Sequence, residues 1–185
     1  MTQKPDHAGF QLYTVGFADL TAKIPDSMSY EDASVLPLAI STAASALYMK
    51  DFLHLPYPST DPKPSGKCIL IYGGSSSVGA LGVQLAAASG VKVIATASAQ
   101  NHALVKSLGA TEVVDYKDPD AVKKITEALK AAGEFAGAYD AIGLPPARKL
   151  CADVMQNFGG GFIADVLNVE EGEKLPDNVK TAMCE

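Results

Sequence analysis

Histidine, cysteine and long apolar runs are scarce in this sequence of 185 residues, and each scarcity excludes a class of protein. The three histidines stand at positions 7, 54 and 102, with no pattern that indicates a Ser-His-Asp hydrolase. The three cysteines, Cys68, Cys151 and Cys184, are odd in number and widely separated, so they predict neither a disulfide scaffold nor a zinc site. No uninterrupted apolar run reaches about 18 residues, so we expect no membrane span.

Positive charge is also in short supply. Fifteen basic residues against 21 acidic ones give a net charge of −6, which argues against nucleic acid as a partner. Apolar residues make up 48% of the chain, which excludes disorder as a global description. The length fits one domain, or one domain with a short appendage. We therefore expect a cytoplasmic protein with no membrane association.

The first third of the chain carries weak structural signals. Phe10–Val15 alternates in polarity and predicts a strand. Ser29 stands three residues before Asp32, a capping-box spacing that predicts the start of a helix. A second helix is expected over Pro37–Lys50, with the proline in its first turn. Residues 55–66 contain four prolines and predict a connecting loop.

After residue 66, short apolar runs alternate with helical segments, and glycines mark the boundaries. The expected strands are Cys68–Tyr72, Val91–Thr96, Thr111–Asp115, Ala138–Ile142, Gly161–Leu167 and Val179–Met183. The expected helices are Val78–Ser89, Gln100–Leu108, Pro119–Ala132 (with Asp118 as its cap) and Pro145–Gln156. This alternation predicts right-handed βαβ crossovers, and hence an α/β fold with a Rossmann-type, doubly wound parallel sheet of about six strands.

A glycine- and serine-rich turn joins the first of these strands to the first of these helices. Aligning it with G-x-G-x-x-G places Gly74, Ser76 and Gly79 on the motif, with serine in the middle position. Small residues let backbone N–H groups approach phosphate oxygens, and Ser75, Ser76 and Ser77 add hydroxyls that can bond phosphates. The turn therefore predicts a nucleotide site. The alternative is a tight strand–helix turn whose serines cap the helix.

The segment after the second strand bears on the choice of nucleotide. An NAD-binding domain usually has a carboxylate there for the ribose 2′-hydroxyl, and positions 96–98 have none. A carboxylate would repel a 2′-phosphate, so its absence permits NADP. Ser98, Gln100 and Asn101 are candidate donors to that phosphate, and His102 is the nearby cation candidate. We expect NADP(H) rather than NAD(H), although no lysine or arginine stands in this segment.

Other nucleotide-binding enzymes match less well. A P-loop is absent, and no tyrosine is followed by lysine at the Tyr-x-x-x-Lys spacing of short-chain dehydrogenases. A methyltransferase shares the glycine turn but prefers an acid after the second strand, so it remains a third and weaker hypothesis.

A series of motifs identifies a family resemblance. The motifs are LTAKIP at 20–25, SYEDASVLPL at 29–38, STAA at 41–44, IYGGSSSVG at 71–79, AS at 97–98, LVKSLGA at 104–110 and VDY at 114–116. In this order they resemble the medium-chain dehydrogenase/reductase superfamily. The last four resemble its fungal zinc-independent branch, which contains the trans-acting enoyl reductases of polyketide synthesis and related toxin-cluster oxidoreductases.

The resemblance implies NADPH binding without zinc, and it implies a set of cofactor contacts. Ser75, Ser76, Ser77 and Val78 would hold the phosphates, Ser98 to Asn101 the 2′-phosphate, Tyr116 the adenosine, and Thr42, Val166 and Leu167 the nicotinamide. For the last three residues, simple core packing is the alternative. No general acid is assigned.

The resemblance also implies a domain plan. Residues 1–28 would be a strand and helix remnant of the catalytic (GroES-like) domain, 29–66 linking helices with a proline-rich loop, and 67–185 the NAD(P)-binding Rossmann domain. We expect a truncated form with little activity alone. The full-length parent would transfer a hydride to the activated double bond of an enone or enoyl substrate. Subunits would pair as a homo-oligomer through the terminal sheet edge. The alternative hypothesis is a non-catalytic nucleotide-binding or interaction module.

Overall fold

One parallel sheet organises the larger part of this protein. The computed structural model describes residues 4–184, which fall into one unit that ends at Val35 and another that begins at Leu36. The strands of the second unit are β1 (Lys67–Tyr72), β2 (Lys92–Thr96), β3 (Glu112–Val114), β4 (Glu134–Asp140), β5 (Gly161–Asp165) and β6 (Val179–Met183). Their order is β3-β2-β1-β4-β5-β6, and all neighbours are parallel. This order is that of a doubly wound Rossmann sheet, which confirms the predicted fold class.

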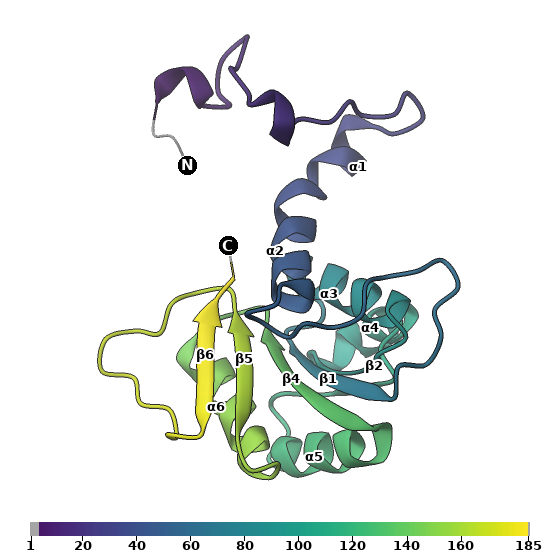
Figure 1. Ribbon diagram of the computed structural model, residues 1–185, viewed down its shortest axis with the longest axis vertical. Helices are drawn as coiled ribbons and strands as arrows, with labels where there is room; N and C mark the ends of the chain where they lie inside the picture. Colours follow the sequence, from purple (N-terminus) through teal and green to yellow (C-terminus); the bar gives the residue numbers. More distant parts are fainter. Residues whose placement is uncertain (1–3, 185) are drawn as a thin grey trace. The chain divides into compact units, whose positions relative to one another are not determined.

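Helices cover both faces of this sheet (Figure 1). The first face packs against α2 (Pro37–Tyr48), α3 (Ser77–Ala88) and α4 (His102–Ser107). The second face packs against α5 (Ala121–Ala132) and α6 (Pro145–Gln156). Strands buried on both sides must be apolar throughout, which is why their sequences form short continuous runs.

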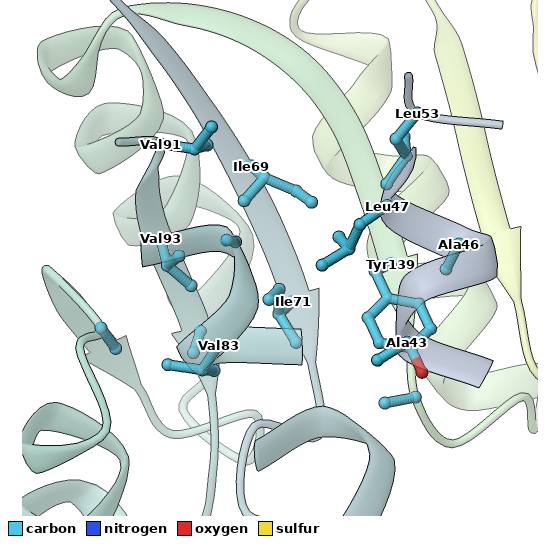
Figure 2. Close-up of a cluster of buried hydrophobic side chains, with 14 of the residues drawn as sticks. Ala43, Ala46, Leu47, Leu53, Ile69, Ile71, Val83, Val91, Val93 and Tyr139 are labelled. Carbon is cyan, nitrogen blue, oxygen red and sulfur yellow. The ribbon is translucent and has the colours of Figure 1, made fainter. Parts of the chain in front are cut away.

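The central strand divides its side chains between two separate cores. Ile69 and Ile71 of β1 point into the first core, whereas Cys68 and Leu70 point into the second. Figure 2 shows the first core, where these isoleucines meet Leu47 of α2. Burying one such aliphatic side chain contributes roughly 1.5–3 kcal/mol, so the two cores account for much of the fold's stability.

Several boundaries differ from those expected, and β5 ends at Asp165 rather than at Leu167. The strand β4 begins at Glu134 rather than at Ala138, because this earlier segment pairs with the start of β1. The expected helix over 100–108 divides into a 3₁₀ turn at 99–101 and α4. Asp118 does not cap α5, which starts three residues later; its carboxylate accepts the Asp120 N–H at 2.8 Å and pairs with Lys124.

The unit that ends at Val35 contains one short α-helix, α1 (Tyr30–Ser34). The Ser29 hydroxyl accepts the Asp32 N–H at 3.0 Å, so the predicted cap is confirmed. The predicted strand over Phe10–Val15 is wrong. A strand needs a partner, and residues 4–35 contain none; instead the Gln11 side-chain amide donates to nearby backbone carbonyls.

Within residues 4–184, no helix combines the length and the apolarity that crossing a membrane requires.

Gly79 allows α3 to start close to the preceding turn, and this generates a stability prediction. A Cβ at this position would lie 2.2 Å from the Gly73 carbonyl oxygen, a backbone atom that can move only with the turn. We expect Gly79→Ala to lower the free energy of unfolding by about 1–3 kcal/mol, measured by urea denaturation. Gly9→Ala is the control, since no heavy atom lies within 4 Å of its Cβ. Equal stability of the two variants would contradict this account of Gly79.

Candidate functional site

A cavity of about 440 Å³ opens at the carboxyl ends of the central strands. It lies where the strand order reverses between β1 and β4, the usual ligand position in an open α/β sheet. Its walls come from the end of β1 and the turn after it, from the segments that follow β2 and β3, from the turn after β4 and from the first turn of α6. The lining residues are Tyr72, Gly73, Ser75, Ser76, Ala97, Ser98, Asn101, Tyr116, Ile142, Leu144, Pro146 and Ala147.

The turn after β1 is anchored to the end of β2. The N–H groups of Gly73 and Gly74 donate to the Thr96 hydroxyl at 3.0 Å and to the Thr96 carbonyl at 2.8 Å. The positive φ of this turn, 79°, falls on Gly73. Ser76 has an ordinary φ of −71°, and its hydroxyl accepts the Gly79 N–H at 3.1 Å. Serine at the middle motif position is therefore unstrained, and it caps α3.

The first turn of α3 has backbone N–H groups that are free to bind a ligand at this edge of the sheet. Ser77 and Val78 begin the helix, so their N–H groups have no carbonyl within the helix to bind. Such N–H groups, together with the helix dipole, favour an anion. The Ser77 side chain is exposed, whereas the Val78 side chain packs against the first core. What these two residues offer a ligand is their backbone.

One amide bridges the two polar walls of the cavity. The Asn101 Nδ2 atom lies 3.2 Å from the Ser75 hydroxyl and 3.3 Å from the Ser98 hydroxyl. The turn after β1 and the segment after β2 are thereby held together at the cavity. Gln100 is exposed and does not line it, and His102 lies half-buried with its Nε2 atom 3.1 Å from the Ala97 carbonyl oxygen.

Tyr116 closes the cavity on the β3 side. Its ring centroid lies 6.0 Å from that of Tyr72, and its side chain remains 38% exposed. The Lys117 ammonium lies 5.7 Å from the Tyr116 ring centroid. An aromatic ring with one open face is a surface on which a nucleobase can stack.

The three residues assigned to the nicotinamide do not line this cavity. The Thr42 hydroxyl donates to the Leu38 carbonyl at 2.8 Å within α2. Val166 is half-buried against the first core. Leu167 is 46% exposed and stands just beyond the end of β5. Their role at a nicotinamide stays a prediction.

Sequence reasoning missed the wall that follows β4. Ile142 and Leu144 line the cavity, as does Tyr72, the last residue of β1. Their position relative to the strands was the available signal, because the carboxyl ends of parallel strands meet at one edge of a sheet. Motif matching looks at glycines and polar residues, so it passed over these apolar positions.

Asp140 is a buried acid at the end of β4, next to this wall. Its Oδ1 atom accepts the N–H groups of Ile142 and Gly143, both at 3.0 Å. Its Oδ2 atom is buried and has no hydrogen-bond partner in the described chain. Burial raises the Asp140 pKa to about 6, and these two N–H donors oppose the shift.

Neither thiol nucleophiles nor a metal cluster is found among residues 4–184. The three cysteines are free and buried, and burial raises the pKa of Cys68 and Cys184 to about 11. A thiol with a pKa that high is protonated at neutral pH and is a poor nucleophile. No group of three His, Cys, Asp or Glu side chains within these residues is arranged to hold a metal ion.

Residues 77–176, more than half of the chain, match the family model described as zinc-binding dehydrogenase. The chain belongs to this family. The chain is 47% identical over 180 residues to the trans-enoyl reductase himH of Aspergillus japonicus, covering 97% of this chain and 51% of that relative. It is 39% identical over 197 residues to the dehydrogenase orsE of Emericella nidulans, covering 99% and 56%. The chain thus spans about half the length of the curated relatives it matches.

Solved structures agree with this assignment. A quinone oxidoreductase of Pseudomonas syringae superposes with a TM-score of 0.66 at 26% identity, covering 89% of this chain and 49% of that one. A mycobacterial protein in complex with NADPH superposes with a TM-score of 0.63 at 25% identity, covering 91% and 50%. The resemblance to medium-chain dehydrogenases and fungal trans-enoyl reductases is confirmed.

The raised pKa of Asp140 predicts how stability depends on pH. Between the ordinary value of 3.8 and about 6, the folded chain holds a proton that the unfolded chain has lost. The Asp140 contribution to stability therefore falls as the pH rises through this window, by up to about 1.4 kcal/mol per pH unit. We expect Asp140→Asn to remove this dependence, because asparagine keeps a carbonyl acceptor and does not titrate.

Urea denaturation of both proteins at intervals from pH 4 to pH 7 measures this effect. Relative to the variant, the wild type should lose stability mainly between pH 4 and pH 6. Asp177→Asn, which removes an exposed carboxylate, is the control and should follow the wild type. A constant difference between wild type and Asp140→Asn would contradict the assignment.

Proposed function

We propose that this chain binds NADP(H) at the cavity and serves as the nucleotide-binding part of an enoyl- or quinone-reductase-like oxidoreductase. The observation that carries the proposal is the pair of hydroxyls, Ser75 and Ser98, that Asn101 links across the cavity. Ser75 belongs to the turn that leads into α3, and the first backbone N–H groups of that helix favour phosphate. The mycobacterial structure with NADPH supports the choice of ligand class.

The residues present fit a phosphorylated dinucleotide. None of the described residues that line the cavity is acidic, so nothing there repels a 2′-phosphate. We assign that phosphate to Ser98 and Asn101, with the exposed Gln100 at the rim. The pyrophosphate is assigned to Ser75, Ser76 and the first N–H groups of α3. Tyr116 offers its ring to the adenine.

The chemistry of the proposed reaction is hydride transfer to the β-carbon of an activated double bond, and bound NADPH would supply that hydride. The contribution of this chain is to bind and orient the dinucleotide. The proposal assigns no step to a metal ion. Because the chain spans half of its curated relatives, substrate binding is assigned to the remainder of a longer parent.

One observation favours a second candidate, a non-catalytic nucleotide-binding module. Among the described residues, the cavity lining includes no His, Lys, Asp, Glu or Cys. Its ionisable members are Tyr72 and Tyr116, and burial raises the Tyr72 pKa to about 12. The described residues that line the cavity therefore offer no His, Lys, Asp, Glu or Cys side chain as a general acid.

Thermal-shift titration of the purified chain tests the proposal, with NADPH, NADH and S-adenosylmethionine as separate ligands. A ligand that binds only the folded state raises the melting temperature by mass action. We expect NADPH to produce the largest shift and S-adenosylmethionine none. No shift with either nicotinamide dinucleotide would refute the proposal. Oxidation of NADPH by an added enone would exclude the non-catalytic module for this chain.

Ser98 provides a test of nucleotide choice. We expect Ser98→Asp to lower the affinity for NADPH relative to NADH by roughly tenfold, because the new carboxylate faces the 2′-phosphate. Ser59→Asp, an exposed change in the proline-rich loop, is the control and should leave the ratio unchanged. Dissociation constants from fluorescence titration give the ratio. An unaltered ratio in Ser98→Asp would remove Ser98 from the phosphate site.

A further inference from the structure

Arg148 is the one arginine in the sequence, and its side chain is fully buried. It belongs to the first turns of α6, and its guanidinium bonds to several groups at once. Its Nε atom donates to the Asp165 carboxylate at 2.6 Å, and its Nη1 atom pairs with Glu173. Its Nη2 atom donates to the Gly143 carbonyl at 2.8 Å and reaches the Asn168 carbonyl at 3.4 Å.

These partners belong to two loops that are far apart in sequence. Gly143 lies in the turn between β4 and α6, whereas Asp165 ends β5, and Asn168 and Glu173 follow it. One planar cation with five fixed donors therefore ties both loops to α6. A lysine ammonium has three donors on one atom and lacks the forked geometry needed for all of these acceptors.

The two loops lie close together at Gly143. Its φ is 73°, and a Cβ there would lie 2.8 Å from both Asp165 Oδ1 and Leu167 Cβ. The N–H groups of Ile142 and Gly143 are held by the Asp140 carboxylate. Asp140 therefore holds two backbone N–H groups of this turn, and Arg148 holds its Gly143 carbonyl.

This turn carries the apolar wall of the cavity. Ile142 and Leu144, on either side of Gly143, both line it. Ile142 also packs onto the glycine turn after β1, where a Cβ on Gly73 would lie 2.6 Å from Ile142 Cγ1. A shift of Gly143 would move both side chains and open the cavity on the β4 side.

We propose that Arg148 is a positioning residue that sets the affinity for the nicotinamide half of the dinucleotide. This inference rests on the proposed function. In a doubly wound sheet the ligand lies across the point where the strand order reverses, here called the switch point. One half of the ligand lies over the strands on one side of this point, and the other half over the strands on the other side. The adenosine-side residues Ser98 and Tyr116 follow β2 and β3. The turn that Arg148 holds follows β4, on the other side.

Comparing a whole ligand with half of it tests this role. NADP⁺ covers both sides of the switch point, whereas 2′,5′-ADP carries only the adenosine side. We expect Arg148→Lys to weaken NADP⁺ binding by roughly tenfold, since the wall loses its fixed position, and to leave 2′,5′-ADP binding within about twofold. Lys149→Met, which removes an exposed neighbour on α6, is the matched control and should change neither affinity.

Glu173→Gln is the second variant, because replacing a buried arginine risks unfolding the chain. It keeps the side-chain shape, removes one charge from the cluster, and should weaken NADP⁺ binding selectively by a few fold. If the affinities for NADP⁺ and 2′,5′-ADP fall together in the folded variants, or neither falls, Arg148 has no positioning role. If the wild type binds neither ligand, the proposed function fails, and this inference fails with it.

Discussion

The common direction of the six strands is the constraint on which the rest of this structure depends. Parallel strands need helical crossovers, and the crossovers cover both faces of the sheet. Every segment that follows a strand then emerges at the same edge. The turn after β1, the loop after β2, Tyr116 after β3 and the turn after β4 meet there for that reason alone. The cavity is a product of topology, and its side chains decide what it can bind.

The same edge concentrates buried charge. Asp140 and Asp165 are register partners on adjacent strands, and both are fully buried beside one guanidinium. The carboxylates of Asp140, Asp165 and Glu173 share a single cation, the Arg148 guanidinium. Arg148 bonds directly to Asp165 and Glu173. Asp140 relies instead on two backbone N–H groups, and its Oδ2 atom has no hydrogen-bond partner among residues 4–184. Burying ionised groups costs desolvation free energy. The structural effect of this cluster is to fix two loops rather than to add stability.

The sequence was sufficient to predict the sheet, because strands buried on both faces leave short apolar runs that alternate with helices. The polar side of the cavity was also predictable, since Ser75, Ser76, Ser98 and Asn101 stand next to strand ends in a known pattern. The strand expected at Phe10–Val15 failed because local alternation says nothing about whether a partner strand exists. Ile142, Leu144 and the Arg148 cluster were not predicted, because their contacts join residues from separate crossovers.

The burial of Arg148 also determines the surface chemistry of the chain. Lysine and arginine together number 15, and the one arginine is buried, so every basic side chain on the surface is lysine or histidine. An anion approaching from solvent therefore meets ammonium point charges, hydroxyls and backbone N–H groups, and never the planar fork of a guanidinium. At the cavity itself the polar groups are neutral. Hydrogen bonds from neutral donors are only weakly screened by salt. We therefore expect the selectivity of the cavity for its ligand to persist at ionic strengths that abolish attraction between surface charges.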